Sequence, residues 1–299
     1  MKSLNPRAPN RFVMKKLLVP CILLALISSC GGGKAGDGDN GADTIDSVVD
    51  TIVPTPVDKE DPIAAQTKVP KAADGVFYDF ISSFCQNSSY QKSRVKFPLP
   101  CTVNGQRQTV TAKEWHFSKL YYNSDIYTVF FPNIKSLRLE TDKAVKKVNV
   151  QWYDTGQDTE SKYCFEKIDD KWMLTSIEEN PIDKDADNGF IGFYSKFVSD
   201  KEYQMDHIAE TIIYDGIDPD YDDEFDVKMV KGKKINISQW NETLIPELPT
   251  TQFSNLDFGQ DLGGDERVVS VESPSSGFAS RLHFHKTSGK WLLCKVENL

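Results

Sequence analysis

The chain has 299 residues, 39% hydrophobic and 11% aromatic, which is enough for packed cores and long enough to suggest two domains. Five of its 35 basic residues and none of its 44 acidic residues precede Cys30, so 30 basic face 44 acidic side chains beyond it, a formal charge of −14. This excess argues against nucleic acid and anionic lipid surfaces as partners, because phosphate contacts need clustered Lys and Arg.

A targeting segment stands near the amino terminus. Lys15 and Lys16 precede an apolar run over residues 17–27, which is followed by two serines and Cys30. The run is shorter than the roughly 20 residues that a spanning helix needs, so it predicts a signal peptide over residues 1–29. The Ile-Ser-Ser-Cys order resembles the lipobox of bacterial lipoproteins, which implies lipid attachment at Cys30 and stable anchoring by two or three acyl chains. The alternative is an ordinary secretory signal with an incidental cysteine.

The next segment, residues 30–73, has the composition of a linker. It contains no aromatic residue and is rich in Gly, Asp, Pro and Thr. Such a segment cannot bury enough apolar surface to offset the entropy lost on ordering. We therefore expect a disordered tether with a root-mean-square length of roughly 35–40 Å.

The rest of the chain contains a duplication. FYDFISSF at residues 77–84 matches FIGFYSKF at residues 190–197 with an offset of 113, and YCFEKIDDKWML matches LHFHKTSGKWLL near the two ends with an offset of 119. Shared composition would not hold a fixed register twice. The sequence therefore predicts two related domains, over residues 74–183 and 184–299.

Both copies predict the same order of elements. Each begins with a helix whose apolar residues recur at i, i+3, i+4 and i+7, with Asp74 and Asn188 as the expected N-caps. In the first copy an alternating strand leads into an Asn-Gly turn, which predicts a hairpin. Thr111 and Glu114 then have capping-box spacing, which predicts a second helix.

Three strands, separated by turn residues, are expected to end each copy. A curved antiparallel sheet that wraps the long helix satisfies both periodicities. The expected strands cover about residues 145–153, 161–168 and 171–178 in the first copy and about residues 267–273, 278–286 and 290–297 in the second.

The stretch FYDFISSFCQNSSYQKSRVKFPLP, the Asn-Gly turn with TAKEW, and DDKWML together resemble a family of uncharacterised Bacteroidetes lipoproteins with a domain of unknown function. The resemblance covers roughly residues 74–299 and weakens at residues 208–226, which replace SRVKFPLP in the second copy. It implies an α+β fold of two tandem cone-shaped domains, nuclear transport factor 2-like (cystatin-like), each a helix packed on a curved antiparallel sheet. It implies a pocket between helix and sheet, and no catalytic residues.

Four cysteines follow the lipobox, and three full pairings are open to them. Cys101 shares the inward alternation of its strand, and Cys85 flanks the apolar stripe of the preceding helix, so Cys85–Cys101 is the disulfide candidate. Two reduced, buried thiols are the alternative. Cys294 is expected to face a core and Cys164 to face outward.

Two clusters have some metal-ligand character, but neither predicts a metal site. The acidic loop between Asp215 and Asp226 lacks the Gly and Glu of an EF-hand and is expected to be solvated, or to dock onto the basic stretch of the first copy. His283 and His285 share a strand face, but a zinc or copper site needs a third ligand. We expect no metal and no cofactor.

No spacing marks out a catalytic residue. His116, Tyr121, Tyr122 and Asp125 could serve as acid or base in a cone pocket, but aromatic residues there are expected in the core. Trp172 and Trp291 are likewise expected in the core, with a pocket floor as the alternative.

The sequence predicts a lipid-anchored module of the bacterial cell envelope, on its periplasmic or surface face, that binds a small ligand or an envelope protein without catalysis. The alternatives are a small-molecule enzyme and a structural assembly component.

Overall fold

The computed structural model describes residues 69–70, 72–123, 125–221, 226–240, 244–273 and 277–299. The signal peptide, Cys30 and nearly all of the predicted tether lie outside the described residues. Within them, no helix is both long and apolar enough to cross a membrane.

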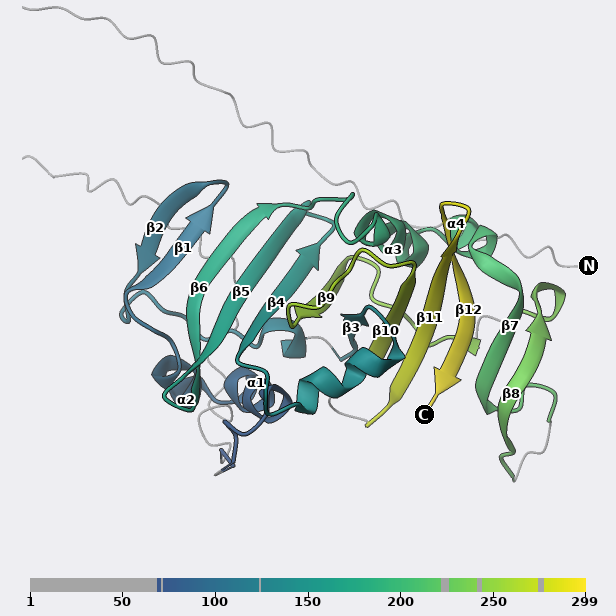
Figure 1. The fold of residues 1–299 in the computed structure, drawn as a ribbon, viewed down its shortest axis with the longest axis horizontal. Helices are drawn as coiled ribbons and strands as arrows, with labels where there is room; N and C mark the ends of the chain where they lie inside the picture. The colour runs from purple at the N-terminus through teal and green to yellow at the C-terminus, as the bar shows by residue number, and fades with distance from the viewer. Residues whose placement is uncertain (1–68, 71, 124, 222–225, 241–243, 274–276) are drawn as a thin grey trace, which may run out of the picture. The chain divides into compact units, whose positions relative to one another are not determined.

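The first half of the described chain, up to residue 183, has the predicted helix, hairpin and three closing strands, with several further elements (Figure 1). Its elements are α1 (Phe77–Gln86), α2 (Ser88–Ser93), β1 (Leu99–Val103), β2 (Gln106–Val110), η1 (Leu120–Asn123), β3 (Tyr127–Phe131), η2 (Ile134–Thr141), β4 (Lys147–Asp154), β5 (Thr159–Ile168) and β6 (Lys171–Pro181).

The second half, from residue 184, repeats most of this order. Its elements are α3 (Phe190–Ser199), α4 (Lys201–Asp206), β7 (Ile208–Ile217), β8 (Met229–Asn236), η3 (Ile237–Gln239), β9 (Gln252–Asp257), β10 (Glu266–Glu272), β11 (Ala279–Thr287) and β12 (Lys290–Asn298).

The strands form two six-stranded sheets, and each sheet takes one edge strand from the other half. Sheet A has the order β2-β1-β6-β5-β4-β9, and sheet B has the order β3-β10-β11-β12-β7-β8. Thus β9 of the second half pairs antiparallel with β4, and β3 of the first half pairs antiparallel with β10 (Figure 1). The domain limits 74–183 and 184–299 stay a prediction, to which the structure adds this exchange of strands.

The exchanged strands are buried because they lie between two cores. All five residues of β3 are buried. Phe131 belongs to the first core, around α1, whereas Phe130 belongs to the second, around α3. Between β3 and β9, the Ser254 backbone N–H donates to Thr128 Oγ1 at 3.2 Å, and the Ser254 hydroxyl donates to the Thr128 carbonyl.

The two halves share a bulge in their closing hairpins. The β5–β6 register shifts between Cys164 and Phe165, and the β11–β12 register shifts at the corresponding positions, His283 and Phe284. The extra residue donates to the carbonyl opposite in both cases: Thr175 Oγ1 to Cys164 at 3.1 Å, and Cys294 Sγ to His283 at 3.4 Å. The bulge is therefore a property of the repeated unit.

Aromatic rings fill the space between each helix and its sheet. The stripe of α1 places Phe77 5.1 Å from Trp172 and Phe84 5.2 Å from Phe165, measured between ring centroids. The corresponding rings in the second half lie at the same separations, 5.0 Å for Phe190–Trp291 and 5.1 Å for Phe197–Phe284. Trp172 and Trp291 are both buried, so the prediction that they are core residues is confirmed.

The second helix predicted at Thr111 is wrong. Thr111 and Glu114 form the capping contacts, at 2.7 and 2.8 Å, but they close a single turn. Beyond that turn, Trp115 inserts into the first core, and the Ser118 backbone donates to and accepts from the Gln91 side-chain amide at 3.0 and 2.6 Å. These tertiary contacts hold the segment extended.

The predicted N-caps are also wrong. Val76 and Gly189 occupy the N-cap positions of α1 and α3, and neither makes a side-chain cap. Asp74 instead accepts from the Trp172 backbone N–H at 3.0 Å and pairs with Arg94 at 2.7 Å.

No disulfide joins the four described cysteines in the structure. Cys85 and Cys101 are buried, and burial raises the pKa of Cys101 to about 11. Cys164 is buried rather than outward, and Cys294 is half-buried, because the shared bulge changes the alternation of these strands. The Cys85–Cys101 pairing stays a prediction: protein purified without reductant and then denatured should show two fewer reactive thiols if the bond forms, and all of them if it does not.

Candidate functional site

Side chains occupy the interiors of both halves, and the open space lies at their edges. The largest fully buried side chains are mostly the aromatic rings of the two cores. Two pockets of ligand size adjoin the helices of the second half.

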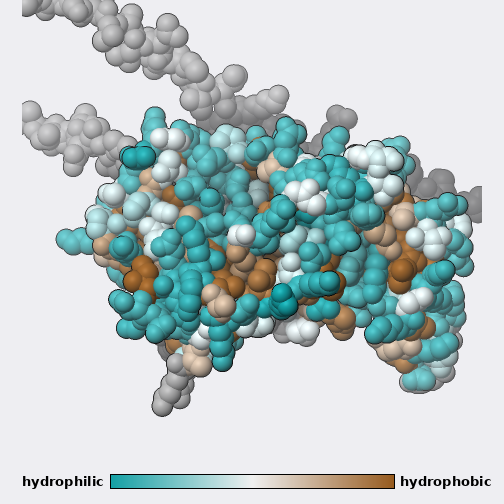
Figure 2. All heavy atoms as spheres, in the orientation of Figure 1, coloured by the Kyte–Doolittle hydropathy of each residue, from teal (hydrophilic) through white to brown (hydrophobic). Residues whose placement is uncertain are grey.

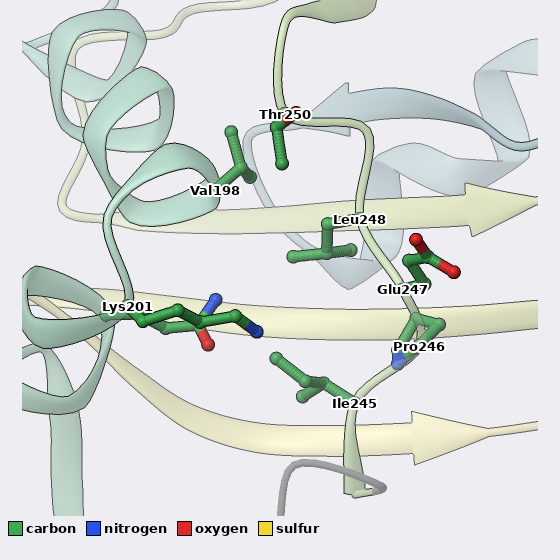
Figure 3. A pocket seen from close by; sticks show the side chains of 8 residues that line it. Val198, Lys201, Ile245, Pro246, Glu247, Leu248 and Thr250 are labelled. Carbon is green, nitrogen blue, oxygen red and sulfur yellow. The ribbon is translucent and has the colours of Figure 1, made fainter. Parts of the chain in front are cut away.

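The first pocket, of about 410 Å³, lies between the α3–α4 junction and the segment that leads to β9. Figure 3 shows Val198 and Lys201 on the helix side, with Ile245 and Leu248 pointing toward them from the opposite segment and Glu247 pointing away at the rim. Its floor is apolar, and it offers one charge of each sign. We call it the apolar pocket.

The second pocket, of about 450 Å³, lies where the start of α3, the end of α4 and the β11–β12 turn meet. We call it the basic pocket. Asp185 is the one carboxylate among its lining residues, whereas the cationic or aromatic ones include Lys184, Lys196, Lys286, Lys290, His207 and Tyr203. In a protein with a formal charge of −9, this is a local reversal of sign.

The repeated unit positions these side chains. Asp200 caps α4 by accepting from the Tyr203 backbone N–H at 3.0 Å, and His207 ends the helix. The His207 and Tyr203 rings stack with centroids 3.8 Å apart, and Lys196 Nζ lies 5.2 Å from the centre of the Tyr203 ring. A planar, aromatic surface therefore stands beside the lysines.

His207 is held as one tautomer. Its Nδ1 lies 2.7 Å from the Tyr203 carbonyl oxygen, which can only accept, so Nδ1 carries the hydrogen. Burial lowers the pKa of His207, and the positive charges of Lys290 and Lys196 lower it further, against the opposite effects of the Tyr203 carbonyl and Asp206. An anion in the pocket would reverse this shift.

A second group of titratable residues lies near β3. Tyr127 donates to Glu272 at 2.7 Å, and its ring stacks on Tyr122 at 5.4 Å. Burial raises the pKa of Tyr122, and burial followed by the charge of Glu272 raises that of Glu140 to about 8. Of the predicted acid–base candidates, Tyr122 joins this group, and His116 and Asp125 are exposed; the side chain of Tyr121 lies outside the described part of the structure.

The histidines and the acidic loop are each engaged separately. His283 Nε2 lies 3.2 Å from Glu297, and His285 Nδ1 lies 2.9 Å from the Asp265 carbonyl. Asp218 pairs with Lys228 at 3.1 Å and with Lys233. In the described part of the chain, no group of three or more His, Cys, Asp or Glu side chains could hold a metal ion.

The sequence reasoning missed the basic pocket. Its lysines are far apart in the chain, and the sequence around each one predicts only a solvated surface residue. A comparison of charge between the two copies would have pointed to it, because Lys196 in α3 stands where the first copy has Ser83.

The chain matches a known protein family and resembles a solved structure. A family profile described as a domain of unknown function (DUF4348) matches residues 57–298. No curated protein matches the chain. Among solved structures, one described as an NTF2-like protein from Bacteroides fragilis NCTC 9343 is similar, with a TM-score of 0.65 and 28% identity, over 78% of this chain and 99% of that chain. The predicted α+β, nuclear transport factor 2-like fold is thereby confirmed.

Proposed function

Since the chain belongs to the DUF4348 family of domains of unknown function, we propose that it is a lipid-anchored binding module of the bacterial cell envelope, without catalytic activity, whose ligand site is the basic pocket. The observation that carries this proposal is the filling of both cone interiors by aromatic rings. A pocket between helix and sheet, where a substrate would otherwise sit, is closed, whereas the basic pocket is open at the edge.

The ligand site can be tested without changing any charge. Native mass spectrometry of mature protein (residues 30–299, Cys30→Ser, exported without lipid) should show a bound small molecule. Tyr203→Ala removes the aromatic wall and should abolish the adduct. Tyr90→Ala, the same change at the corresponding position of the first half, should leave it bound. An adduct that survives Tyr203→Ala, or none in the unaltered protein, contradicts the proposal.

Lipid anchoring has its own test. Cys30→Ala should abolish labelling by a palmitate analogue and leave the signal peptide uncleaved by the lipoprotein peptidase. Cys21→Ala, which alters the cysteine inside the apolar run, should leave both unchanged. Continued labelling of Cys30→Ala would rule out this attachment site.

The enzyme alternative is favoured by one observation, the group formed by the buried Tyr127 and the half-buried Glu140 and Glu272. A carboxylic acid that keeps its proton near neutral pH can act as a general acid. None of these three residues lines either of the two ligand-sized pockets described above.

The assembly alternative would be favoured by a large exposed apolar patch. On the face seen in Figure 2, hydrophilic side chains predominate and hydrophobic ones are scattered among them.

A further inference from the structure

The positions that form the basic pocket have counterparts in the first half, and the two sets can be compared position by position. Arg94 ends α2 as His207 ends α4. Each accepts through its carbonyl from the closing strand, Arg94 from the Leu174 N–H and His207 from the Leu293 N–H, both at 2.8 Å. The two sites are therefore equivalent in backbone structure.

In the first half the cation at the end of α2 has a carboxylate partner. Arg94 pairs with Asp74 at 2.7 Å, and its guanidinium lies 4.8 Å from the centre of the Tyr90 ring. A second acidic residue, Asp79, stands in the first turn of α1.

In the second half neither of these two carboxylates is available to the pocket, because one is paired elsewhere and the other is replaced. Asp187, the counterpart of Asp74, is engaged by the buried Arg267, whose Nε lies 2.8 Å from it. Gly192 stands where the first half has Asp79. Val148 occupies the position of Arg267 in the first half, so the residue that captures the carboxylate exists in the second half alone.

The remaining cations contact neutral groups. Lys286 Nζ lies 2.8 Å from the Asn188 carbonyl, and Lys290 Nζ lies 2.7 Å from the Asp206 carbonyl. Lys196 lies over the Tyr203 ring. Among the described residues, no carboxylate lies within ion-pair distance of these three lysines, and Lys184 alone of the four has one, Asp158 at 3.3 Å.

From this difference between the halves we infer that the basic pocket binds a small molecule that carries a phosphate monoester on a planar ring. The inference rests on the proposed function, whose ligand site it specifies. Several lysines suit a phosphate dianion, because each ammonium acts as a point charge and a dianion gains more from several such charges than a singly charged carboxylate does. The Tyr203 and His207 rings, stacked on each other beside Lys196, line the same pocket and supply aromatic contacts for the ligand's ring.

His207 gives the site a spectroscopic signature. With Nδ1 donating to Tyr203, Nε2 is the nitrogen that gains a proton, and the protonated ring then offers a second donor. The groups that act on it are Lys196, Lys290, Asp206 and the Tyr203 carbonyl. A bound dianion should raise the pKa of His207, a change that a merely structural histidine would not show.

Three probes with the same ring separate the chemistries: phenyl phosphate, benzoate and benzyl alcohol. Each is titrated into the mature chain (residues 30–299, Cys30→Ser) at pH 7.5, and the His207 ring signals and the Kd are followed by NMR. Phenyl phosphate should bind at least about tenfold more tightly than benzoate, and benzyl alcohol should not bind. The phosphate complex should weaken as salt rises.

Matched variants locate the effect. Lys290→Gln should weaken the binding of phenyl phosphate by about tenfold. Lys171→Gln, which alters the first-half counterpart of Lys290, should leave the Kd unchanged. Equal effects of the two variants would overturn the assignment of the site.

The other outcomes are equally decisive. Equal affinity for benzoate, or binding of benzyl alcohol, would overturn the phosphate class while leaving a ligand site in place. Failure of all three probes to bind would overturn the inference. The proposed function would still be tested separately, by whether native mass spectrometry finds an adduct that Tyr203→Ala abolishes. Binding to vesicles that contain phosphatidic acid, without binding of phenyl phosphate, would show that the pocket recognises the phosphate of a lipid headgroup. It would overturn the inference that the ligand is a small molecule.

Discussion

At the scale of single residues, the ion pair between Arg267 and Asp187 is the most consequential feature of the second half. Both side chains are buried, with exposed fractions of 0% and 4%, and the guanidinium lies 5.4 Å from the centre of the Trp291 ring. Removal of one partner from a buried pair leaves an uncompensated charge, which is strongly destabilising. The pair therefore fixes the start of α3 and keeps Asp187 out of the basic pocket.

Asp187→Ala should lower the free energy of unfolding by about 3–5 kcal/mol, since the buried Arg267 would keep its bonds to backbone carbonyls but lose the opposite charge. Asp74→Ala is the matched change in the first half. It should cost less, because Arg94 and Asp74 are 15% and 25% exposed and water can replace the lost partner. Urea unfolding of the two variants measures the difference, and equal losses would show that burial of the second pair has no energetic consequence.

Glu140 gives a prediction of pH dependence. Its pKa is raised to about 8 by burial and by Glu272, and is lowered in part by Arg281. An unfolded glutamate ionises near pH 4.3, so the folded state holds a proton that the unfolded state loses, and stability falls as pH rises from about 4.5 to 8. Glu140→Gln cannot ionise. It should match the unaltered protein near pH 4 and be more stable at pH 8 to 9, by thermal unfolding.

Glu114 provides the control for this titration. The pKa of its exposed carboxyl is lowered by hydrogen bonds from Thr111, so Glu114→Gln should give no gain at alkaline pH. A Glu140→Gln gain of the same size at pH 4 and pH 8 would show that packing, not ionisation, is responsible.

At the scale of elements, the helices and closing strands were predictable because their signals are local. The i, i+3, i+4, i+7 stripes predicted α1 and α3, and turn residues bounded the meanders, which the structure confirms. The capping box at Thr111 predicted a helix that does not form, because its local contacts start a turn but do not extend it. At Thr111 the insertion of Trp115 and the Ser118–Gln91 bonds prevail over helix propensity.

The exchange of β3 and β9 could not be predicted, because pairing between strands far apart in sequence leaves no local pattern. The run of five buried residues in β3 is apolar at four positions and reads equally well as a buried strand of its own sheet. The basic pocket was hidden for the same reason, since Lys196 and Lys290 come together only through α3, α4 and β12.

The two faces of β3 can be separated by adjacent substitutions. Phe130 packs 4.9 Å from Tyr194 and 5.6 Å from Phe253, ring to ring, whereas Phe131 packs in the first core. Phe130→Ala and Phe131→Ala should each cost about 3–5 kcal/mol. Amide exchange should rise mainly in α3 for the first and mainly in α1 for the second. The same pattern in both variants would contradict the two-sided burial of β3.

At the scale of the whole molecule, the exchange of strands ties the halves together. A first half made alone would expose Phe130, which packs in the second core, and leave β4 without its partner β9. The second half would lose β3 from β10 in the same way. An unpaired edge beside exposed apolar side chains favours association, and a half that remains monomeric would lack a complete core.

Neither 69–183 nor 184–299 should therefore unfold cooperatively as a monomer. Mixed in equal amounts, they should assemble one to one and recover a cooperative urea transition, because each then supplies the edge strand that the other lacks. The intact chain joined by its own linker should be more stable than the mixture at micromolar concentration, since the second association becomes intramolecular. Size-exclusion chromatography with light scattering, followed by urea titration of each sample, gives the answer. A monomeric half with its own sharp transition would show that the exchanged strands add little, and that the predicted domains fold independently.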